Sequence, residues 1–402
     1  MSSRSSRPPG VRIPLALVPL AVYVGVTVLA PVANGAARLE GFWEHAGITL
    51  AVAGLLTCAW LACTSAARID ILRAPRSRAP LAEAPPMTLH SLEPTLATLH
   101  GHFSRELPPV LTIASGDRVR FKTLDVRWGR FEHDDPFAPA EPLPGRDLER
   151  DPGHAMCGPV WIEGARACMT LEVRVISLRV GRWGWTSAGG YPSHWNQKLG
   201  LDGPPSVSVR WALDADTQTG RDAKGRTVEL RPFLGVMGMP PDEPGRHPTT
   251  PPRYCGGNID CKELVAGSTL YLPISVDGAL FSTGDGHAVQ GDGEVAGPAL
   301  ECPMEAAELE FLLRPELKLV RPRAHTPRGW VTFGFHDSLD EATAVALSDM
   351  LDVLDEQLGC GRREALALAS LVVDLHVTQI ENGVRGVHAM VAHEALARHV
   401  TR

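Results

Sequence analysis

Two long apolar segments stand at the start of the chain. Residues 13–37 and 46–67 contain no Asp, Glu, Lys or Arg, and a helix of about 20 apolar residues crosses a hydrocarbon core of about 30 Å. Arginines precede the first segment and follow the second, whereas the connecting loop has little net charge. Because cytoplasmic flanks carry an excess of Lys and Arg, the pattern predicts a transmembrane hairpin in residues 1–72, with helices at about 13–35 and 46–67.

A cleaved signal peptide is the alternative for the first segment. Small residues at Ala33–Ala37 suit a cleavage site, but the apolar region is longer than the usual length of about 7–15 residues. We therefore expect the hairpin to attach the protein to the plasma membrane, with the rest of the chain facing the cytoplasm. Residues 73–88 are rich in Pro, Ala and Arg and are predicted to be a linker.

Alternation of apolar and polar residues predicts β-strands over most of the following chain. Residues 107–125 are typical of a strand, a turn and a second strand, and further strands are expected within 157–180 and 231–241. The content of 39 Gly and 34 Pro favours many turns over long helices. Residues 126–153 are polar and Pro-rich and are predicted to form a loop.

Helical periodicity is clear only near the C-terminus. A capping-box pattern at Ser338–Glu341 precedes a helix that is expected to run to about Leu358. A second helix is expected at about 362–370, followed by a β-hairpin within 371–391. These elements predict an α+β fold that is mainly β, with a smaller C-terminal α/β part.

Charge and cysteine usage narrow the function. The formal net charge of −7 is spread along the chain without a basic stripe, so no nucleic-acid partner is expected. The eight cysteines form no C-x-x-C pair and are expected to be reduced. The sequence also lacks the G-x-S-x-G, H-E-x-x-H, P-loop and Rossmann patterns, which argues against serine hydrolases, HExxH metalloproteases and nucleotide-binding enzymes.

The densest group of ionisable residues and glycines is G-D-G-H-A-V-Q-G-D-G-E at 284–294, directly after the apolar run 270–280. Its ionisable residues are Asp285, His287, Asp292 and Glu294. A carboxylate crowded against an apolar strand is costly unless it is paired, protonated or bound to a cation. His with Asp or Glu is a usual ligand set for zinc or another divalent ion. The G-G-N-I-D run at 256–260 likewise places an amide and a carboxylate after a glycine turn.

Several segments resemble the acetamidase/formamidase family. The resemblance is carried mainly by G-G-N-I-D (256–260), L-V-A-G-S-T-L-Y-L-P-I-S-V (264–276), G-A-L-F-S-T-G-D-G-H-A-V-Q-G-D-G-E-V (278–295) and E-C-P-M (301–304). It extends over about residues 89–392, leaving 393–402 as a tail. The resemblance implies a β-sandwich with a smaller C-terminal α/β part, and a homo-oligomer.

The same resemblance identifies residues 126–153 as an insertion, because family members carry a shorter, glycine-containing link at this point. Within it, His133, Asp134 and Asp135 are interpreted as part of a solvated loop or, alternatively, of a lid.

The resemblance implies hydrolysis of a short amide, such as formamide or acetamide, to ammonia and a carboxylate. A divalent metal would polarise the weakly electrophilic carbonyl and lower the pKa of a bound water to about 7. We expect zinc, with calcium as the alternative. The predicted metal ligands are Asp260, Asp285 and His287, with Asp125 added from the resemblance. The predicted catalytic residues are Glu294 or Glu163 as acid/base, with Asn258 and Gln290 as donors to the oxyanion.

Several of these side chains have a second interpretation. Glu163 also suits a turn carboxylate that faces water, and Arg253 either pairs with a site carboxylate or lies on the surface. Asp374, Gln379 and His388 either line the site or make buried structural hydrogen bonds.

The alternative hypothesis belongs to another functional class. In it, the protein is a membrane-anchored module that binds or senses a small amide or a metal without turnover. The N-terminal segments favour it, as do Ala155–Cys157 and Ala167–Met169, which depart from the family pattern. The retention of the site carboxylates and of His287 argues against it. A cysteine nucleophile among the residues flanking 256–260 is the weakest alternative, because no histidine partner is evident.

Overall fold

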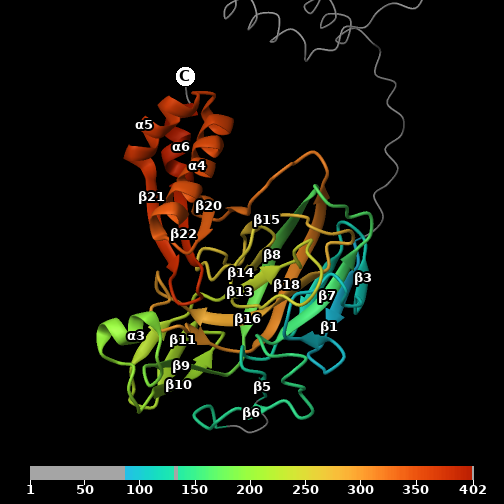
Figure 1. The fold of residues 1–402 in the computed structure, drawn as a ribbon, viewed down its shortest axis with the longest axis vertical. Coiled ribbons are helices and arrows are strands. Elements are labelled where there is room, and N and C mark those ends of the chain that lie inside the picture. The colour runs from blue at the N-terminus through green and yellow to red at the C-terminus, as the bar shows by residue number, and fades with distance from the viewer. Residues whose placement is uncertain (1–86, 131–134, 401–402) are drawn as a thin grey trace, which may run out of the picture. The chain divides into compact units, whose positions relative to one another are not determined.

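The computed structural model describes the backbone of residues 87–130 and 135–400, and the side chains of all but the last three of these residues. The predicted transmembrane helices at 13–35 and 46–67 lie outside the described residues. Within the described part, no helix is both long enough and apolar enough to span a membrane. The transmembrane hairpin in the predicted fold class is therefore not supported, and the fold is corrected to a mainly β architecture (Figure 1).

The first of two large sheets has nine strands in the order β1-β4-β18-β8-β15-β19-β20-β22-β21. All neighbouring strands in it are antiparallel except the β1–β4 pair. Its strands are β1 (Leu89–Leu92), β4 (Arg118–Phe121), β8 (Thr170–Val180), β15 (Thr269–Pro273), β18 (Met304–Arg314), β19 (Arg323–His325), β20 (Gly329–His336), β21 (Val373–Gln379) and β22 (Arg385–Ala392).

The second sheet has the strand order β12-β11-β10-β9-β17-β16-β13-β14, and β7 pairs with β16, β2 and β3 beside this row. Its strands are β2 (Leu99–His100), β3 (Leu111–Ile113), β7 (Met156–Ile162), β9 (Trp183–Ala188), β10 (Val207–Asp214), β11 (Thr219–Asp222), β12 (Thr227–Glu229), β13 (Phe233–Gly238), β14 (Gly256–Asn258), β16 (Phe281–Val289) and β17 (Leu300–Glu301). A short helix, α3 (His194–Leu199), follows β9.

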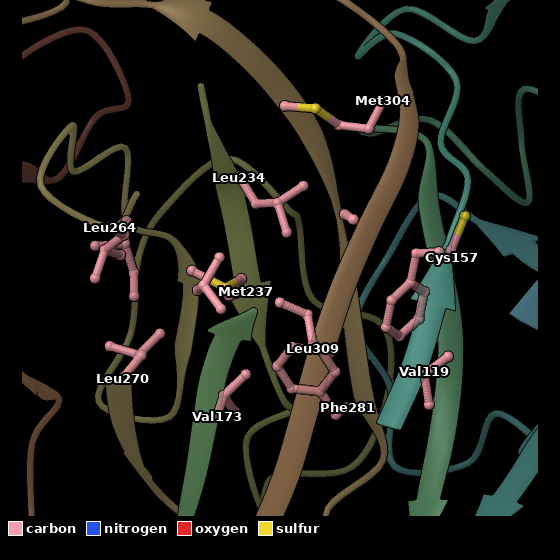
Figure 2. Close-up of a cluster of buried hydrophobic side chains, with 14 of the residues drawn as sticks. Val119, Cys157, Val173, Leu234, Met237, Leu264, Leu270, Phe281, Met304 and Leu309 are labelled. Atoms are coloured by element: carbon pink, nitrogen blue, oxygen red, sulfur yellow. The ribbon is translucent and has the colours of Figure 1, made fainter. Parts of the chain in front are cut away.

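The two sheets pack as the layers of a sandwich. Figure 2 shows side chains from the first sheet, such as Val173 and Leu309, in one buried cluster with Met237 and Phe281 from the second. The ring centroid of Phe281 lies 5.0 Å from that of Phe311 on β18. Burial of these apolar side chains, at roughly 1.5–3 kcal/mol each, is the main force that holds the layers together.

The C-terminal α/β part extends the first sheet and does not form a sheet of its own. Its helices α4 (Leu339–Leu358), α5 (Arg362–Val372) and α6 (His393–Val400) pack with β20, β21 and β22 around a second apolar cluster. The structure confirms the helix predicted after Ser338, although the Ser338 side chain makes no capping hydrogen bond. The approach of α4 to β20 needs glycine at Gly334, because a Cβ there would meet the Ala342 carbonyl oxygen at 1.9 Å.

The predicted strands within 107–125 are present as β3 and β4, but they belong to different sheets. β3 pairs with β7, whereas β4 pairs with β1 and β18. The predicted loop at 126–153 contains only the short pair β5 (Gly129–Arg130) and β6 (Glu141–Pro142) among its described residues. Of its three candidate lid residues, His133 and Asp134 lie outside the described residues.

Candidate functional site

Strand β16, in the middle of the second sheet, carries the centre of the site. Asp285 and His287 lie on one face of β16, because alternate side chains of a strand share a face. Glu301 on β17 pairs directly opposite His287. Asp260 follows β14, and Glu294 lies between β16 and β17. Four carboxylates, from β16, from β17, from the chain after β14 and from the link between β16 and β17, therefore converge on one imidazole.

Short distances join these groups. The His287 Nε2 atom lies 3.4 Å from Asp285 Oδ1, 3.4 Å from Glu301 Oε2 and 3.9 Å from Glu294 Oε1. Asp260, His287 and Glu294 offer ligand atoms within 4.8 Å of one another, as do Asp285, His287 and Glu301. Each of the five residues is at most 6% exposed. Four carboxylates at this depth require compensating positive charge, protons or a bound cation.

Gln290 determines which nitrogen of His287 faces the carboxylates. Its Nε2 donates to the carbonyl oxygens of Asp260 and Thr378, at 2.7 and 3.4 Å, so its Oε1 is left as an acceptor. That oxygen lies 2.9 Å from His287 Nδ1, which must therefore carry a proton. In the neutral ring Nε2 then holds a lone pair that points toward the carboxylates, as a metal ligand does.

The donor atoms around His287 fit a bound cation. Five buried atoms there have no hydrogen-bond partner among the described residues: Asp260 Oδ1, Asp285 Oδ1, His287 Nε2, Glu294 Oε2 and Glu301 Oε2. Gly235 on β13 leaves the space beside them open, since a Cβ there would lie 2.5 Å from Asp285 Oδ2 and 2.7 Å from Asp260 Oδ1. Oxygen donors with one imidazole suit zinc or a related divalent ion.

The electrostatic coupling within the cluster is strong. Burial together with the charge of Asp285 raises the pKa of Asp260 to about 8, and burial raises the pKa of Glu301 to about 7. Burial beside Asp260 also raises the pKa of Glu294 well above its ordinary value. Burial alone would lower the pKa of His287, but the charges of Glu301 and Asp285 raise it well above the usual range. Such mutual repulsion of carboxylates is relieved when a cation binds.

Three of the four carboxylate residues have an unusual backbone. The φ angles of Asp260, Asp285 and Glu294 are 53°, 57° and 44°. Non-glycine residues seldom adopt this left-handed region, and such conformations concentrate at functional sites.

An open cavity of about 580 Å³ reaches the cluster. Asp285, Glu294 and Glu301 line this cavity, together with Asn258 and Asn382. Asn258 donates to Asp260 Oδ2 at 2.7 Å and Asn382 to the same oxygen at 2.8 Å. A small substrate in this cavity could therefore approach three carboxylates and two amide side chains.

The structure places two of the predicted site residues away from the cluster. Both oxygens of Asp125 are used, since Trp185 Nε1 donates to Oδ2 at 2.7 Å and the Gly129 N–H donates to Oδ1. Glu163 lies on an exposed turn after β7 and does not line the cavity. Gln290 lies behind His287 with its amide hydrogens already donated, so it orients the imidazole and does not face a substrate.

The residues for which the sequence left both a site role and a structural or surface role open also lie outside the cluster. Arg253 is partly exposed and donates to the carbonyl oxygens of Pro248 and Pro251, so it does not pair with a site carboxylate. Gln379 and His388 make buried structural hydrogen bonds to Val384 O and the Thr378 hydroxyl, and Asp374 is exposed. Cys255 and Cys261 are buried. Burial raises the pKa of the Cys255 thiol to about 12 and raises that of Cys261 well above its ordinary value, which opposes a thiolate nucleophile.

Sequence reasoning missed three residues that the structure brings to the site. Glu301 begins the E-C-P-M segment, so the resemblance itself contained a signal. Asn382 comes from the β21–β22 turn, far along the chain, and no local pattern marks it. His154 lines the cavity with a buried Nδ1 that has no partner among the described residues.

Comparisons with known proteins identify the family to which the chain is similar. The sequence profile described as "Acetamidase/Formamidase family" matches residues 90–247 and 243–317, which together exceed half of the chain. An acetamidase from Mycolicibacterium smegmatis is 22% identical over 259 residues, 49% of this chain and 61% of that protein. A formamidase from Methylophilus methylotrophus is 24% identical over 246 residues, 49% of this chain and 59% of that protein. The chain thus spans less than two thirds of the length of these two relatives.

Solved structures cover more of the chain. An acetamidase from Bacillus halodurans has a TM-score of 0.66 and 26% identity, covering 77% of this chain and 100% of that one. An acetamidase from Yersinia enterocolitica has a TM-score of 0.67 and 25% identity, covering 78% of this chain and 94% of that one. The two-sheet architecture is therefore similar to these two acetamidase structures over nearly their whole length.

Proposed function

We propose that this chain, which belongs to the acetamidase/formamidase family, is an amidase that hydrolyses a small linear amide to ammonia and a carboxylate. The observation that carries the proposal is the convergence of four buried carboxylates on the Nε2 atom of His287 beside the cavity. The names of the relatives support the substrate class, and the cluster supplies groups suited to the chemistry.

We further propose that the reaction depends on a divalent metal, with zinc expected. Asp260, Asp285 and His287 would hold it, with Glu294 or Glu301 as a further donor. When bound, the metal would supply a Lewis acid that polarises the amide carbonyl and lowers the pKa of water.

The remaining roles are assigned to side chains of this chain. Gln290 holds His287 in one tautomer, and Asn258 and Asn382 orient Asp260 through hydrogen bonds to Oδ2. Glu294 and Glu301 both line the cavity, so either is placed to take a proton from the attacking water and pass it to the leaving nitrogen. The overall balance is one amide and one water consumed, and one carboxylate and one ammonium ion formed, since ammonia takes up the proton of the acid.

The test is ammonia release from formamide, acetamide and propionamide by the purified full chain. We expect turnover that is lost on dialysis against a chelator and regained on adding Zn²⁺, with Ca²⁺ as the comparison ion. Removal of the metal is also expected to lower Tm, because it leaves the carboxylates uncompensated. Full activity after chelation would contradict the metal assignment, and no ammonia from any amide with any added ion would contradict the proposed reaction.

A further inference from the structure

We propose that Arg127 binds an anionic group of the substrate, so that the preferred amide carries a carboxylate at its far end. This inference rests on the proposed amide hydrolysis and names the substrate class of the same cavity. The carboxylate cluster would receive the neutral amide, and the arginine would receive the carboxylate of the substrate.

Arg127 is held on a rigid platform at the cavity wall. Its guanidinium carbon lies 3.9 Å from the ring centroid of Trp185, and both residues line the cavity. Trp185 is itself fixed, because its Nε1 donates to Asp125 Oδ2 at 2.7 Å. A guanidinium stacked on an indole keeps its charge and its edge N–H groups available for a planar acceptor.

Across residues 87–130 and 135–400, no carboxylate forms an ion pair with the Arg127 guanidinium, whereas Arg118, Arg174 and Arg179 on strands of the first sheet each have one. The charge of Arg127 acts on the nearby buried Asp125, but both oxygens of that carboxylate already accept hydrogen bonds, from Trp185 and Gly129. A carboxylate ligand would satisfy the Arg127 guanidinium through the two parallel hydrogen bonds typical of arginine.

A second positive charge lines the same cavity. Arg146 is stacked over Trp128 at 4.4 Å, and its Nε and Nη2 donate to the carbonyl oxygen of Asp151. These bonds tie Arg146 to the backbone, so it adds to the positive potential. The Arg127 guanidinium makes no hydrogen bond to any residue that the structure describes, so its donors are open to a ligand. Both arginines come from the 126–153 segment, the insertion expected from the family resemblance.

Charges of both signs line the cavity. Asp285, Glu294 and Glu301 belong to the carboxylate cluster, and an anionic substituent placed beside them would be repelled. A molecule with an amide and a carboxylate therefore has one favourable orientation. A volume of about 580 Å³ is within the range of about 300–1,000 Å³ that holds ligands much larger than acetamide.

The test compares each anionic amide with a neutral isostere in which an isopropyl group replaces the carboxylate. Succinamate is paired with isocaproamide and malonamate with isovaleramide, and the readout is kcat/KM for ammonia release. We expect a preference of about tenfold or more for at least one anionic amide, equal to about 1.4 kcal/mol. Raising the ionic strength should reduce this preference, because salt screens exposed charge pairs.

Arg127→Gln should abolish most of the preference, lowering kcat/KM on the anionic amide more than on its isostere. Arg127→Lys should retain part of it, since the charge remains but the bidentate geometry is lost. Arg221→Gln, which removes an equal charge on β11 outside the cavity lining, is the matched control and should keep the preference.

Equal rates on both members of each pair in the unmodified protein would overturn the inference. So would an equal effect of Arg127→Gln on both members. If no amide of either kind is hydrolysed, the proposed function fails, and calorimetric binding of succinamate then decides the inference separately. Binding that Arg127→Gln removes and Arg221→Gln preserves would support it, and absent or unaltered binding would refute it.

Discussion

Gln290 Oε1 lies 2.9 Å from His287 Nδ1, and this one hydrogen bond determines what the imidazole presents to the carboxylate cluster. Because the amide hydrogens of Gln290 are donated to backbone carbonyls, the amide cannot rotate without losing them. The Nε2 lone pair therefore faces the carboxylate oxygens in the neutral ring, which is the form that binds a metal.

Replacing Gln290 with Met should preserve the volume of the side chain and remove the hydrogen bond that orients the His287 imidazole. We expect metal affinity to fall about 10–100-fold, as for other partners that orient metal-binding histidines. The measurement is competition with a chromophoric chelator, with thermal melting to confirm folding. Gln218→Met is the matched control, because the Gln218 side chain donates to the nearby Ala215 carbonyl and lies away from the carboxylate cluster. An unchanged affinity in a folded Gln290→Met protein would contradict the assigned role.

Gly235→Ala should disturb the cluster with a single added carbon. The new Cβ would lie 2.5 Å from Asp285 Oδ2 and 2.7 Å from Asp260 Oδ1, so one carboxylate or the strand must move. A displacement near 1 Å at a reacting centre costs about 100-fold in rate, and we expect a loss of that order in kcat/KM for acetamide. Gly291→Ala is the control, because a Cβ at Gly291 meets nothing within 4 Å. Equal activity of the two variants would argue against a tightly packed site.

His287→Ala tests the imidazole directly. Loss of a metal-binding group should remove several kcal/mol of transition-state stabilisation, so kcat/KM should fall by about 100-fold or more. Bound metal, measured by elemental analysis, should fall with it. The exposed His194 provides the comparison, and His194→Ala should leave both quantities unchanged. Activity of the His287→Ala protein within about threefold, less than 1 kcal/mol, would show that His287 is not a ligand.

His100 should make stability dependent on pH. Burial lowers the pKa of His100 to about 4, with smaller effects from His102, Asp151 and Arg150. Because the unfolded chain takes up a proton near pH 6.5, unfolding is favoured as pH falls from about 6.5 to 4. The contribution of His100 to the free energy of unfolding is fully present above about pH 6.5. About 3 kcal/mol of it is lost as the pH falls to about 4.

Urea unfolding at pH 7, 6 and 5 would measure this dependence. His100→Gln should be less stable at pH 7, because the hydrogen bond to Ser282 Oγ changes, but its free energy of unfolding should fall less steeply toward pH 5. His194→Gln, at an exposed position, should keep the slope of the unmodified protein. Identical slopes for His100→Gln and the unmodified protein would contradict the burial effect.

Much of the local structure followed from neighbouring residues. The helix predicted from Ser338 to about Leu358 corresponds to α4, Leu339–Leu358, and the hairpin predicted within 371–391 corresponds to β21 and β22. Capping residues, apolar periodicity and turn glycines act over a few positions, so a single sequence is enough to locate such elements.

The pairing of strands that are far apart in the sequence determined the sheet arrangement and the assembly of the site. Nothing near β3 or β4 in the sequence shows that they join different sheets, because strand partners are chosen by burial across the whole fold. Asp285 and His287, by contrast, lie two positions apart on one strand, so the sequence alone was enough to place them together. Only the tertiary structure brought in Glu301 and Asn382, whose contacts with the cluster depend on the pairing of β17 with β16 and on the turn between β21 and β22.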